Sequence, residues 1–288
     1  MISYFPGCTL KTKARNLDRA LTASLAALGI EVVELPRWNC CGVVPSLSDD
    51  DLLRLVAPVR DLVRAQQQGA HTLLTGCSMC YNVLAHANEL MRRQPDKLAT
   101  INLFMDEEPD YTGSVEVVHL LQLLERELGW QELAAKVKRP LKGLRVAAYY
   151  GCTLQRPRQV AIDRRPTAML FEECLQALGA EVARFTAAHD CCGSYQIVSH
   201  PELAVEQSSL VISGAQAAGA ELLVTSCPLC EYNLGTRQSA LGLGEELPTV
   251  YLSQLLALAL GLDPALCAFE DNMVALPALL SEHQLLGG

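Results

Sequence analysis

The sequence predicts an α/β fold of two homologous modules, each a small parallel sheet flanked by helices, related by pseudo-two-fold symmetry. First, the chain repeats itself: ISYFPGCTL at residues 2–10 matches VAAYYGCTL at 146–154. Second, short apolar segments alternate with longer segments whose apolar residues recur at helical spacing. Third, ten of the twelve cysteines occupy matching places in the two halves. Strands that alternate with helices imply parallel sheets covered by helices.

The composition is that of a folded, acidic protein. Half of the 288 residues are hydrophobic and 19% are charged, which excludes a disordered chain. The formal net charge of −9, without a basic patch, argues against a protein that binds nucleic acid. The N-terminus lacks the apolar stretch of a secretory signal. We therefore expect a cytoplasmic protein, associated with a membrane at most through its partners.

In the first half, strands and helices follow one another at short intervals. ISYF at 2–5 is typical of a short strand, and apolar residues at helical spacing predict a helix over 17–28. That helix is expected to end at Gly29, a good C-cap residue. EVVEL at 31–35 and HTLLT at 71–75 are predicted strands. The order is therefore that of a β–α–β–α unit.

The second half repeats this order. LRVAAYY at 144–150 is a predicted strand, followed by a helix over 168–178 that is expected to end at Gly179. EVARF at 181–185 and ELLVT at 221–225 are the next predicted strands.

A helix that ends in a Pro/Gly linker is expected between the halves, at residues 130–143, WQELAAKVKRPLKG. The first module is accordingly placed at residues 1–140 and the second at residues 141–288.

The last matching pair of segments is VVHLLQLL and TVYLSQLL, which share a glutamine at the same position, Gln122 and Gln254. The second segment belongs to the longest apolar run of the chain, residues 250–262. This run is shorter than the about 20 residues that a membrane-spanning helix needs. We expect it to form a buried helix.

The cysteines follow predicted strands, at the edge where parallel α/β sheets gather their functional residues. They form two equivalent sets of five: Cys8, Cys40, Cys41, Cys77 and Cys80 in the first module, and Cys152, Cys191, Cys192, Cys227 and Cys230 in the second. A buried cysteine is often only a small core residue, but this does not explain two sets in one register. It is sufficient for Cys174, on the apolar face of a predicted helix, and for Cys267, so we expect both to be structural.

The number of thiols in each set limits the chemistry. Four thiolates satisfy a tetrahedral zinc ion or a cubane [4Fe–4S] cluster, which leaves one cysteine of each set unexplained. A thioredoxin-type dithiol accounts for a CxxC pair and not for the other three cysteines. Five thiolates, two of them adjacent in sequence, indicate a larger or unusually shaped iron–sulfur centre. The CxxC segments also lead from a strand into a predicted helix, whose N-terminal N–H groups and dipole stabilise an anionic cluster.

The chain resembles the CCG-domain proteins, and most of all the B subunit of heterodisulfide reductase. The resemblance covers nearly the whole chain and rests on YFPGC, WNCCG and TGCSMCYN in the first module, and on YYGC, RP at 156–157, CCG, CPLCEYNL and RQ at 237–238 in the second. It implies that each five-cysteine set holds a noncubane [4Fe–4S] cluster and that a disulfide substrate binds between the two clusters. All ten cysteines of the family pattern are present, so both sets are the expected ligands.

The same resemblance implies the catalytic subunit of a heterodisulfide reductase-like complex, which reduces or forms a disulfide. Two facing clusters would each deliver one electron and bind one product sulfur, where the Lewis acidity of iron stabilises the developing charge. Family members receive electrons from an iron–sulfur C subunit, which is fed by a flavin-containing A subunit. This chain has no GxGxxG after a strand, so we expect no flavin or nicotinamide on it.

Two other functions stay open at this point. CCG domains also occur in lactate, glycolate and succinate/fumarate redox complexes, so an electron-transfer subunit without disulfide chemistry is the main alternative. A zinc-stabilised scaffold is the other. Two complete cysteine sets favour the reductase, since a pure relay needs no paired clusters.

Several polar residues near the cysteines are weaker candidates. His189 and Asp190 precede the second CCG and are candidates for protonating a departing thiolate or binding the substrate, although a hydrogen-bonded loop pair is the simpler interpretation. The acidic stretch MDEEPD at 105–110 is expected to be an exposed loop. Four basic residues follow the first cysteine of each set and either attract an anionic disulfide or form a solvated surface: Lys11, Lys13, Arg156 and Arg158.

Overall fold

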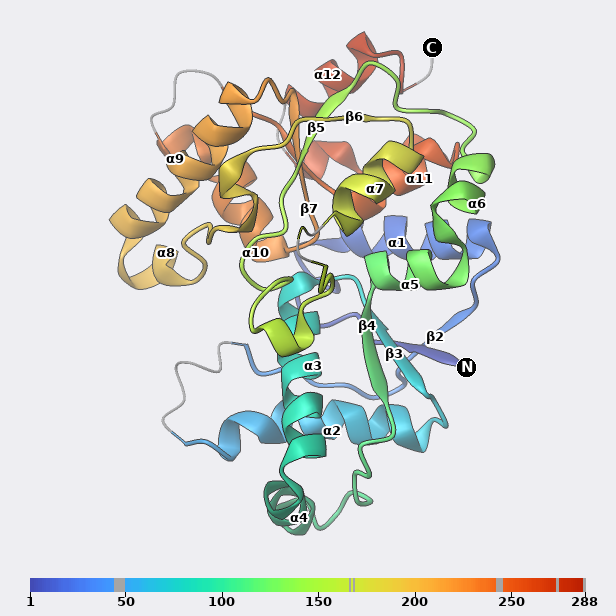
Figure 1. Ribbon diagram of the computed structural model, residues 1–288, viewed down its shortest axis with the longest axis vertical. Coiled ribbons are helices and arrows are strands. Elements are labelled where there is room, and N and C mark those ends of the chain that lie inside the picture. Colours follow the sequence, from blue (N-terminus) through green and yellow to red (C-terminus); the bar gives the residue numbers. More distant parts are fainter. Residues whose placement is uncertain (44–49, 166, 168, 242–245, 273–274, 287–288) are drawn as a thin grey trace.

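The computed structural model describes residues 1–43, 50–165, 167, 169–241, 246–272 and 275–286. In these residues it has two four-stranded parallel sheets, one in each half of the chain, flanked by helices (Figure 1). The strand orders are β2-β1-β3-β4 and β6-β5-β7-β8, so the second sheet repeats the connectivity of the first. The structure therefore confirms the predicted α/β fold with two similar halves.

The first sheet is built around β1, which lies between β2 and β3. Ile2 pairs with Val32 on one side and with Thr72 on the other, and β4 extends the sheet beyond β3. All three pairings are parallel, so the chain must cross over the sheet between strands, and helices form these crossovers. The strands are β1 (Ile2–Tyr4), β2 (Val32–Glu34), β3 (Thr72–Thr75) and β4 (Glu116–His119).

The second sheet has the same plan, with β5 in the centre. Val146 pairs with Val182 on one side and with Leu222 on the other, and β8 extends the sheet beyond β7. The predicted EVARF strand is shortened to two residues, and a 3-10 turn, η3 (Thr186–His189), follows it. The strands are β5 (Arg145–Ala148), β6 (Glu181–Val182), β7 (Leu222–Thr225) and β8 (Thr249–Tyr251).

Helices cover these sheets. Those before the second sheet are α1 (Arg15–Leu28), α2 (Leu53–Gln67), α3 (Ser78–Arg93), α4 (Pro95–Phe104), α5 (Leu120–Glu127) and α6 (Gly129–Lys136). The remainder are α7 (Leu170–Ala177), α8 (Gln196–Ser199), α9 (Pro201–Ala217), α10 (Pro228–Glu231), α11 (Leu252–Ala259) and α12 (Ala275–Glu282). The three helices expected from sequence periodicity and the linker correspond to α1, α7 and α6. Helix α1 ends at Gly29, whose φ of 78° lies in the left-handed region that favours glycine.

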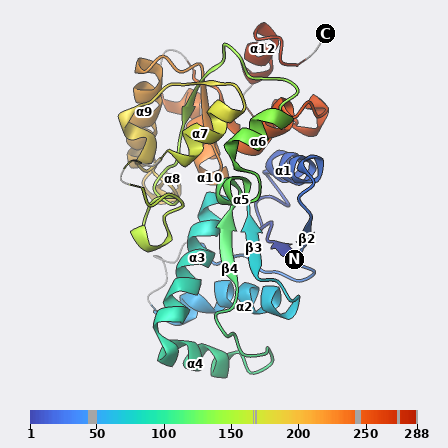
Figure 2. The ribbon, with the colours of Figure 1, turned by 45° about the vertical axis from the view of Figure 1, so that its right-hand side comes forward.

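One packing arrangement joins the two modules and occurs twice. Helix α1 of the first module packs against α11 of the second, and α7 of the second packs against α5 and α6 of the first. Because α1 corresponds to α7 and α5 to α11 in the repeat, the two contacts are equivalent under the pseudo-two-fold symmetry. Figure 2 shows α1 and α5 at the level where the two modules meet. One buried apolar cluster accordingly runs through both modules.

The apolar run at 250–262 begins as a strand and continues as a helix. Tyr251 ends β8, and all eight residues of α11 are buried. A buried helix was expected here and is present, although the first residues of the run pair with β7 instead. None of the helices in the described part of the chain is long and apolar enough to cross a membrane.

Candidate functional site

The cysteines lie beyond the carboxyl ends of the first three strands of each module. In the first module, Cys8 follows β1, the Cys40–Cys41 pair follows β2, and Cys77 follows β3. The second module repeats this placement. Cys77 and Cys227 are the N-cap residues of α3 and α10, with extended backbones that let the chain turn from strand into helix. The fold therefore gathers residues far apart in sequence at one edge of each sheet.

The structure brings the first set together. The Sγ atoms of Cys8 and Cys40 are 3.7 Å apart, and those of Cys41 and Cys80 are 3.6 Å apart. Cys8 and Cys40 are exposed, whereas the other three are buried. Gly7 is needed beside them, because a Cβ at this position would lie 3.0 Å from the Sγ of Cys80 and its φ is 75°.

The second set is gathered in the same way and is more enclosed. The Sγ atoms of Cys192 and Cys230 are 3.4 Å apart. The thiol of Cys191 hydrogen bonds with those of Cys152 and Cys192. None of these five thiols is exposed.

The two sets meet at one contact. The thiols of Cys77 and Cys227 interact, which lowers the pKa of Cys77, and both side chains are buried. The residues beside them hold this contact, since Ser78 N donates to Ser226 O at 3.1 Å and the two serine hydroxyls are 2.6 Å apart. The ten sulfurs consequently form one continuous row in the order Cys8, Cys40, Cys41, Cys80, Cys77, Cys227, Cys230, Cys192, Cys191 and Cys152.

The crowded thiols change one another's ionisation. Hydrogen bonds from neighbouring thiols lower the pKa of Cys41 to about 4 and the pKa of Cys191 to about 3. Hydrogen bonding to the adjacent thiolate, together with burial, raises the pKa of Cys40 and of Cys152. Hydrogen bonds from Cys227 and Cys80 also lower the pKa of Cys77. The first set thus favours two thiolates and the second favours one at Cys191, and thiolate is the form that binds metal. Ionising all five thiols requires nearby positive charge, which metal ions supply.

The arrangement of the sulfurs fits a centre with several metals better than a single ion. In the described residues, no three thiols, imidazoles or carboxylates surround one point as ligands of a lone metal ion do. Two sulfurs on one tetrahedral metal, at about 2.3 Å from it, lie about 3.8 Å apart. Three neighbouring Sγ pairs of the row, Cys8–Cys40, Cys41–Cys80 and Cys192–Cys230, lie 3.4 to 3.7 Å apart. Adjacent thiols are therefore spaced to share a metal, while the row as a whole is too extended for one ion.

A polar network holds the Cys40–Cys41 pair, the first CC pair. This network was not predicted from the sequence. Asn39 N donates to an Asp61 carboxylate oxygen at 2.9 Å, and Arg64 Nη1 donates to Asn39 Oδ1 at 2.8 Å. Asp61 is fully buried on α2, and burial raises its pKa to about 8. In the sequence, this network is indicated only by the position of Asp61 among the apolar residues of a helix.

The acidic stretch MDEEPD differs in part from the expected exposed loop. Most of its acidic residues are exposed, but the side chain of Glu108 is 13% exposed. Its carboxylate lies 3.5 Å from Arg64, 3.7 Å from Arg37 and 3.8 Å from Arg60. This loop consequently contributes to the network that supports the first CC pair.

Different side chains support the second CC pair. Asn233 Nδ2 donates to the carbonyl oxygens of Cys192 and Ser194, both at 3.0 Å, and lies 3.6 Å from the Sγ of Cys192. Ser208 Oγ donates to the same Cys192 carbonyl at 3.0 Å. In the repeat, Asn233 corresponds to Val83, which cannot donate a hydrogen bond. The two sites therefore share their cysteines and differ in their surroundings.

A cavity of about 600 Å³ lies beside the first set and reaches the second. This volume is typical of small-molecule sites, which span about 300 to 1,000 Å³. All five cysteines of the first set line it, and the second set contributes Cys227. Glu231 also lines it, and burial raises its pKa to about 7. A π-helix, η4 (Tyr232–Thr236), brings Tyr232 and Thr236 to the same wall.

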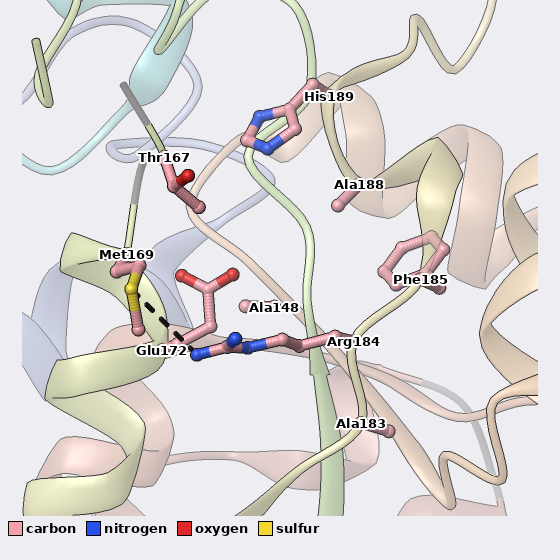
Figure 3. A pocket seen from close by; sticks show the side chains of 9 residues that line it. All are labelled: Ala148, Thr167, Met169, Glu172, Ala183, Arg184, Phe185, Ala188 and His189. Carbon is pink, nitrogen blue, oxygen red and sulfur yellow. Dashed lines mark hydrogen bonds between the residues drawn. The ribbon is translucent and has the colours of Figure 1, made fainter. Parts of the chain in front are cut away.

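His189 faces a different and smaller cavity. Its ring lies 4.7 Å from that of Tyr150, and it lines a space of about 160 Å³ with Glu172 and Arg184 (Figure 3). Burial lowers its pKa, and its Nδ1 atom is buried without a hydrogen-bond partner among the described residues. The carbonyl of Asp190 accepts a hydrogen bond from Tyr149 OH at 2.7 Å. In the described residues, His189 is therefore not hydrogen bonded to Asp190 through Nδ1, and it does not line the large cavity.

The four basic candidates have separate environments. Lys13 lines the large cavity, whereas Lys11 forms ion pairs with Asp18 at 3.0 Å and with a second carboxylate. Arg156 and Arg158 are exposed and do not line that cavity.

The two cysteines outside the sets are buried. Cys174 lies on α7 and Cys267 near the C-terminus, and burial raises the pKa of each to about 12. The Sγ of Cys267 donates to the carbonyl of Gln254 at 3.5 Å. Both therefore lie in the environment of an unreactive core residue.

Comparison with known proteins identifies one family that matches both halves of the chain. The CCG cysteine-rich domain matches residues 2–85 and 146–235, so each match includes one complete cysteine set. The chain is 34% identical to the 8-methylmenaquinol:fumarate reductase membrane anchor subunit of Wolinella succinogenes, over 94% of this chain and 96% of that one. It is 30% identical to the B subunit of the ferredoxin/F420H2-dependent CoB-CoM heterodisulfide reductase of Methanosarcina acetivorans, over 95% and 93%.

A further relative and one solved structure extend this comparison. A protein of Archaeoglobus profundus, named as similar to the B subunit of heterodisulfide reductase, is 27% identical, over 92% of both chains. Among solved structures, a hypothetical protein from Helicobacter pylori superimposes with a TM-score of 0.76 at 15% identity, over 94% of this chain and 51% of that one. This last likeness concerns the fold alone.

Proposed function

Because this chain belongs to the family of the CCG cysteine-rich domain, we propose that it is the iron–sulfur subunit of a multi-subunit oxidoreductase. In this proposal the first module comprises residues 1–140 and the second residues 141–288, and each module holds one iron–sulfur centre. The observation that carries this proposal is the continuous row of ten thiols, with five from each module. Relatives of nearly the same length are named as subunits of reductases, which supports a role within a complex.

The ligands of the two proposed centres are the two sets of five cysteines. The donor atoms fit, since neighbouring sulfurs are spaced to share a metal and one thiol of each CC pair ionises readily. A fifth thiolate per set supports a noncubane [4Fe–4S] cluster rather than a cubane one, which takes four. When bound, such clusters accept and donate single electrons and act as Lewis acids toward sulfur. The chain itself shapes the space around them.

The proposed reaction is reduction or formation of a disulfide in the cavity that touches both sets. This chain's residues bind the substrate beside the first set and bring it within reach of Cys227. The apolar walls exclude water from the S–S bond, which strengthens electrostatic interactions inside the cavity. No side-chain nucleophile is needed, and His189 belongs to another cavity.

The proposed partners are the iron–sulfur C subunit and the flavin-containing A subunit of a heterodisulfide reductase-like complex. The relatives named for the B subunit of such reductases support this assignment. Peripheral membrane association through partners is also proposed, and the Wolinella relative, named a membrane anchor subunit, supports it.

A second function is favoured by that same relative, which at 34% identity is named for fumarate reduction. In this alternative, the chain relays electrons within a complex and binds no disulfide. The two functions share the iron–sulfur centres and differ in whether a disulfide or thiol binds at the cavity.

One experiment separates the candidates. The anaerobically purified chain is analysed for iron, sulfide and zinc, and EPR spectra are recorded before and after thiols or disulfides are added. The reductase predicts about eight irons per chain and EPR signals that change with thiol or disulfide. The same iron content with signals that do not respond supports the relay, and zinc without iron excludes both.

A further inference from the structure

The small cavity that His189 lines contains a buried carboxylate without a counter-ion. Glu172 lines this cavity of about 160 Å³ and is 7% exposed. In the described residues, which include every lysine, arginine and histidine of the chain, no cation lies at ion-pair distance from its carboxylate. Burying an ionised carboxylate is unfavourable unless a cation balances its charge. Glu172 therefore lacks the partner that a buried carboxylate normally has.

The chain satisfies this carboxylate only in part. Tyr150 OH donates to Glu172 Oε2 at 2.5 Å, and the same hydroxyl accepts from Phe171 N at 2.9 Å. Glu172 also lies in the first turn of α7, where the helix dipole acts as about half a positive charge. None of the described residues donates a hydrogen bond to Glu172 Oε1. This oxygen is therefore free to accept from a ligand in the cavity.

Two other polar groups line the same space. Arg184 lies between β6 and η3, and His189 ends η3. In the view of Figure 3, the Glu172 carboxylate lies between these two side chains. Arg184 is exposed, its Nη2 is 3.9 Å from Met169 Sδ, and it forms no ion pair with a described carboxylate. The cavity thus has an anion inside, a cation where it meets solvent, and the unpartnered Nδ1 of His189 on its wall.

The rest of the lining limits the size of a ligand. Three alanines and one aromatic ring form much of the wall: Ala148, Ala183, Ala188 and Phe185. A water molecule takes about 30 Å³ in the liquid, so a cavity of about 160 Å³ holds about five or six groups of that size. An ammonium and a carboxylate joined by a single carbon have this size, as in glycine and alanine.

We propose that this cavity binds a small amino acid in its zwitterionic form. Its ammonium group donates to Glu172 Oε1 and to the Nδ1 of His189, and its carboxylate accepts from the guanidinium of Arg184. Each charged group of the ligand then meets an opposite charge of the chain in a charge-assisted hydrogen bond. The ligand also supplies the cation that the buried carboxylate lacks.

This site is separate from the space between the two cysteine sets, since no cysteine lines it. It lies close to the second set, because His189 is two residues before Cys191 and the Ala188 carbonyl accepts from Gly151 N, next to Cys152, at 3.1 Å. An amino acid bound here is accordingly an effector rather than the substrate of a disulfide reaction. The inference does not depend on the proposed disulfide chemistry.

Calorimetric titration of the anaerobically purified, iron-loaded chain tests this site with the ligands themselves. We expect glycine and L-alanine to bind with a Kd on the order of 0.1 to 1 mM. Methylammonium and acetate each have only one of the two charged groups and should bind at least about tenfold more weakly. L-leucine has both groups and a larger side chain, and should also bind about tenfold more weakly because the walls leave no room for it.

Variants test the two charged contacts. Glu172→Gln should weaken glycine binding by about tenfold to a hundredfold, because the amide still accepts from Tyr150 OH and has no charge to pair with the ammonium group. Arg184→Gln should weaken it by about fivefold, since an exposed ion pair contributes less.

Two charge-matched controls accompany them. Glu173→Gln removes the neighbouring carboxylate on α7, and Arg19→Gln removes an exposed arginine on α1. Neither residue lines the cavity, so both variants should bind glycine as tightly as the unsubstituted chain.

Absence of glycine binding, or equal binding of glycine and L-leucine, would overturn the inference. Equal affinity for methylammonium and glycine would do so as well, since it would indicate a site for a cation alone. Unchanged glycine binding in Glu172→Gln contradicts the placement of the ligand, and if that variant does not fold, the comparison of ligands on the unsubstituted chain decides. Iron content and disulfide reduction are measured separately, so the proposed function stands or fails independently of this site.

Discussion

At the scale of single residues, the second cysteine of each CC pair distinguishes this site from a four-thiolate site. Cys41 reaches the CxxC pair through Cys80, at 3.6 Å, while its neighbour Cys40 reaches Cys8 at 3.7 Å. Each member of the pair therefore joins a different part of the set. A four-ligand centre needs only one of these connections.

Replacing the buried member of a CC pair tests this role. Cys41→Ala or Cys192→Ala should reduce the iron and sulfide content to about half, since one of two centres is lost and the other remains. Cys174→Ala, a buried cysteine outside both sets, is the matched control and should retain all its iron. Full iron content in the Cys41 and Cys192 variants, measured after anaerobic purification, would contradict a five-thiolate centre.

Asn233 is the residue through which the two centres should differ in reduction potential. Its side chain donates toward the Sγ of Cys192 at 3.6 Å, and hydrogen bonds to ligand sulfurs raise the potential of an iron–sulfur centre. Asn233→Val, which gives the second module the residue found at Val83, should lower the potential of one centre by an amount on the order of 30 to 60 mV.

An EPR-monitored redox titration of both centres provides this measurement. Ser208→Ala is the control, because it removes a hydrogen bond to the Cys192 carbonyl and leaves the sulfur untouched. If both variants shift the potential equally, Asn233 acts through the backbone rather than through the sulfur.

Asp61 should make the stability of the first module depend on pH. Burial raises the pKa of Asp61 to about 8, whereas in the unfolded chain this carboxyl titrates near its ordinary value of about 4. The folded chain therefore keeps a proton that the unfolded chain releases. The stability that this neutral carboxyl contributes is complete below about pH 4 and is lost as the pH rises toward 8, by at most about 1.4 kcal/mol per pH unit.

Asp61→Asn tests this dependence, because the amide still accepts the hydrogen bond from Asn39 and cannot ionise. The Tm of the unsubstituted chain should fall relative to that of the variant between pH 5 and pH 8. Differences between the two chains cancel the titration of other groups, such as Glu231. Parallel Tm curves across this range would show that Asp61 does not hold the proton.

At the scale of the elements, the shared glutamines Gln122 and Gln254 fix the change from strand to helix in both modules. Gln122 Oε1 accepts from His119 N at 3.0 Å, and Gln254 Oε1 accepts from Tyr251 N at 2.9 Å. Each caps the helix at the point where β4 or β8 runs into it. At α5 the His119 ring completes a capping box by accepting from Leu121 N at 3.3 Å. The repeat showed that these glutamines match, and the structure supplies the reason.

Removing these caps should destabilise the chain unequally. Gln122→Ala should cost about 1 kcal/mol, the usual value for a cap. Gln254→Ala should cost more, about 2 to 3 kcal/mol, because this buried side chain also donates to the Cys267 carbonyl at 2.8 Å and to Asn272 at 2.7 Å. Denaturant unfolding of both variants measures the difference, and a larger loss for Gln122→Ala would contradict this assignment.

The CxxC helices show where sequence patterns stop being informative. The segments that begin at Cys77 and Cys227 align without a gap, yet α3 continues to Arg93 while α10 ends at Glu231 and a π-helix follows. Gly235 belongs to that turn, and a Cβ there would lie 2.9 Å from an oxygen of Glu231. Such a close approach depends on tertiary packing, which a local pattern does not contain.

At the scale of the whole molecule, the sequence was sufficient for the first three strands of each module, the repeat and the two cysteine sets, because periodicity and register express these features locally. It did not predict β4 and β8, which run directly into helices. It was not sufficient for the Cys77–Cys227 contact or for the cavity on one side of it. Both depend on how α1 packs against α11 and α7 against α5, which brings together residues about half a chain apart. Asp61 and Asn233 were missed for the same reason, since their role depends on partners far along the chain.

The central claim is that each module holds one iron–sulfur centre and that the two centres meet at Cys77 and Cys227. Anomalous X-ray scattering at the iron edge, from crystals of the anaerobically purified chain, tests it most directly. We predict two separate groups of iron, one within each five-cysteine set, with the contact between Cys77 and Cys227 lying between them. Iron at only one set, or anomalous signal at the zinc edge instead, would contradict the claim.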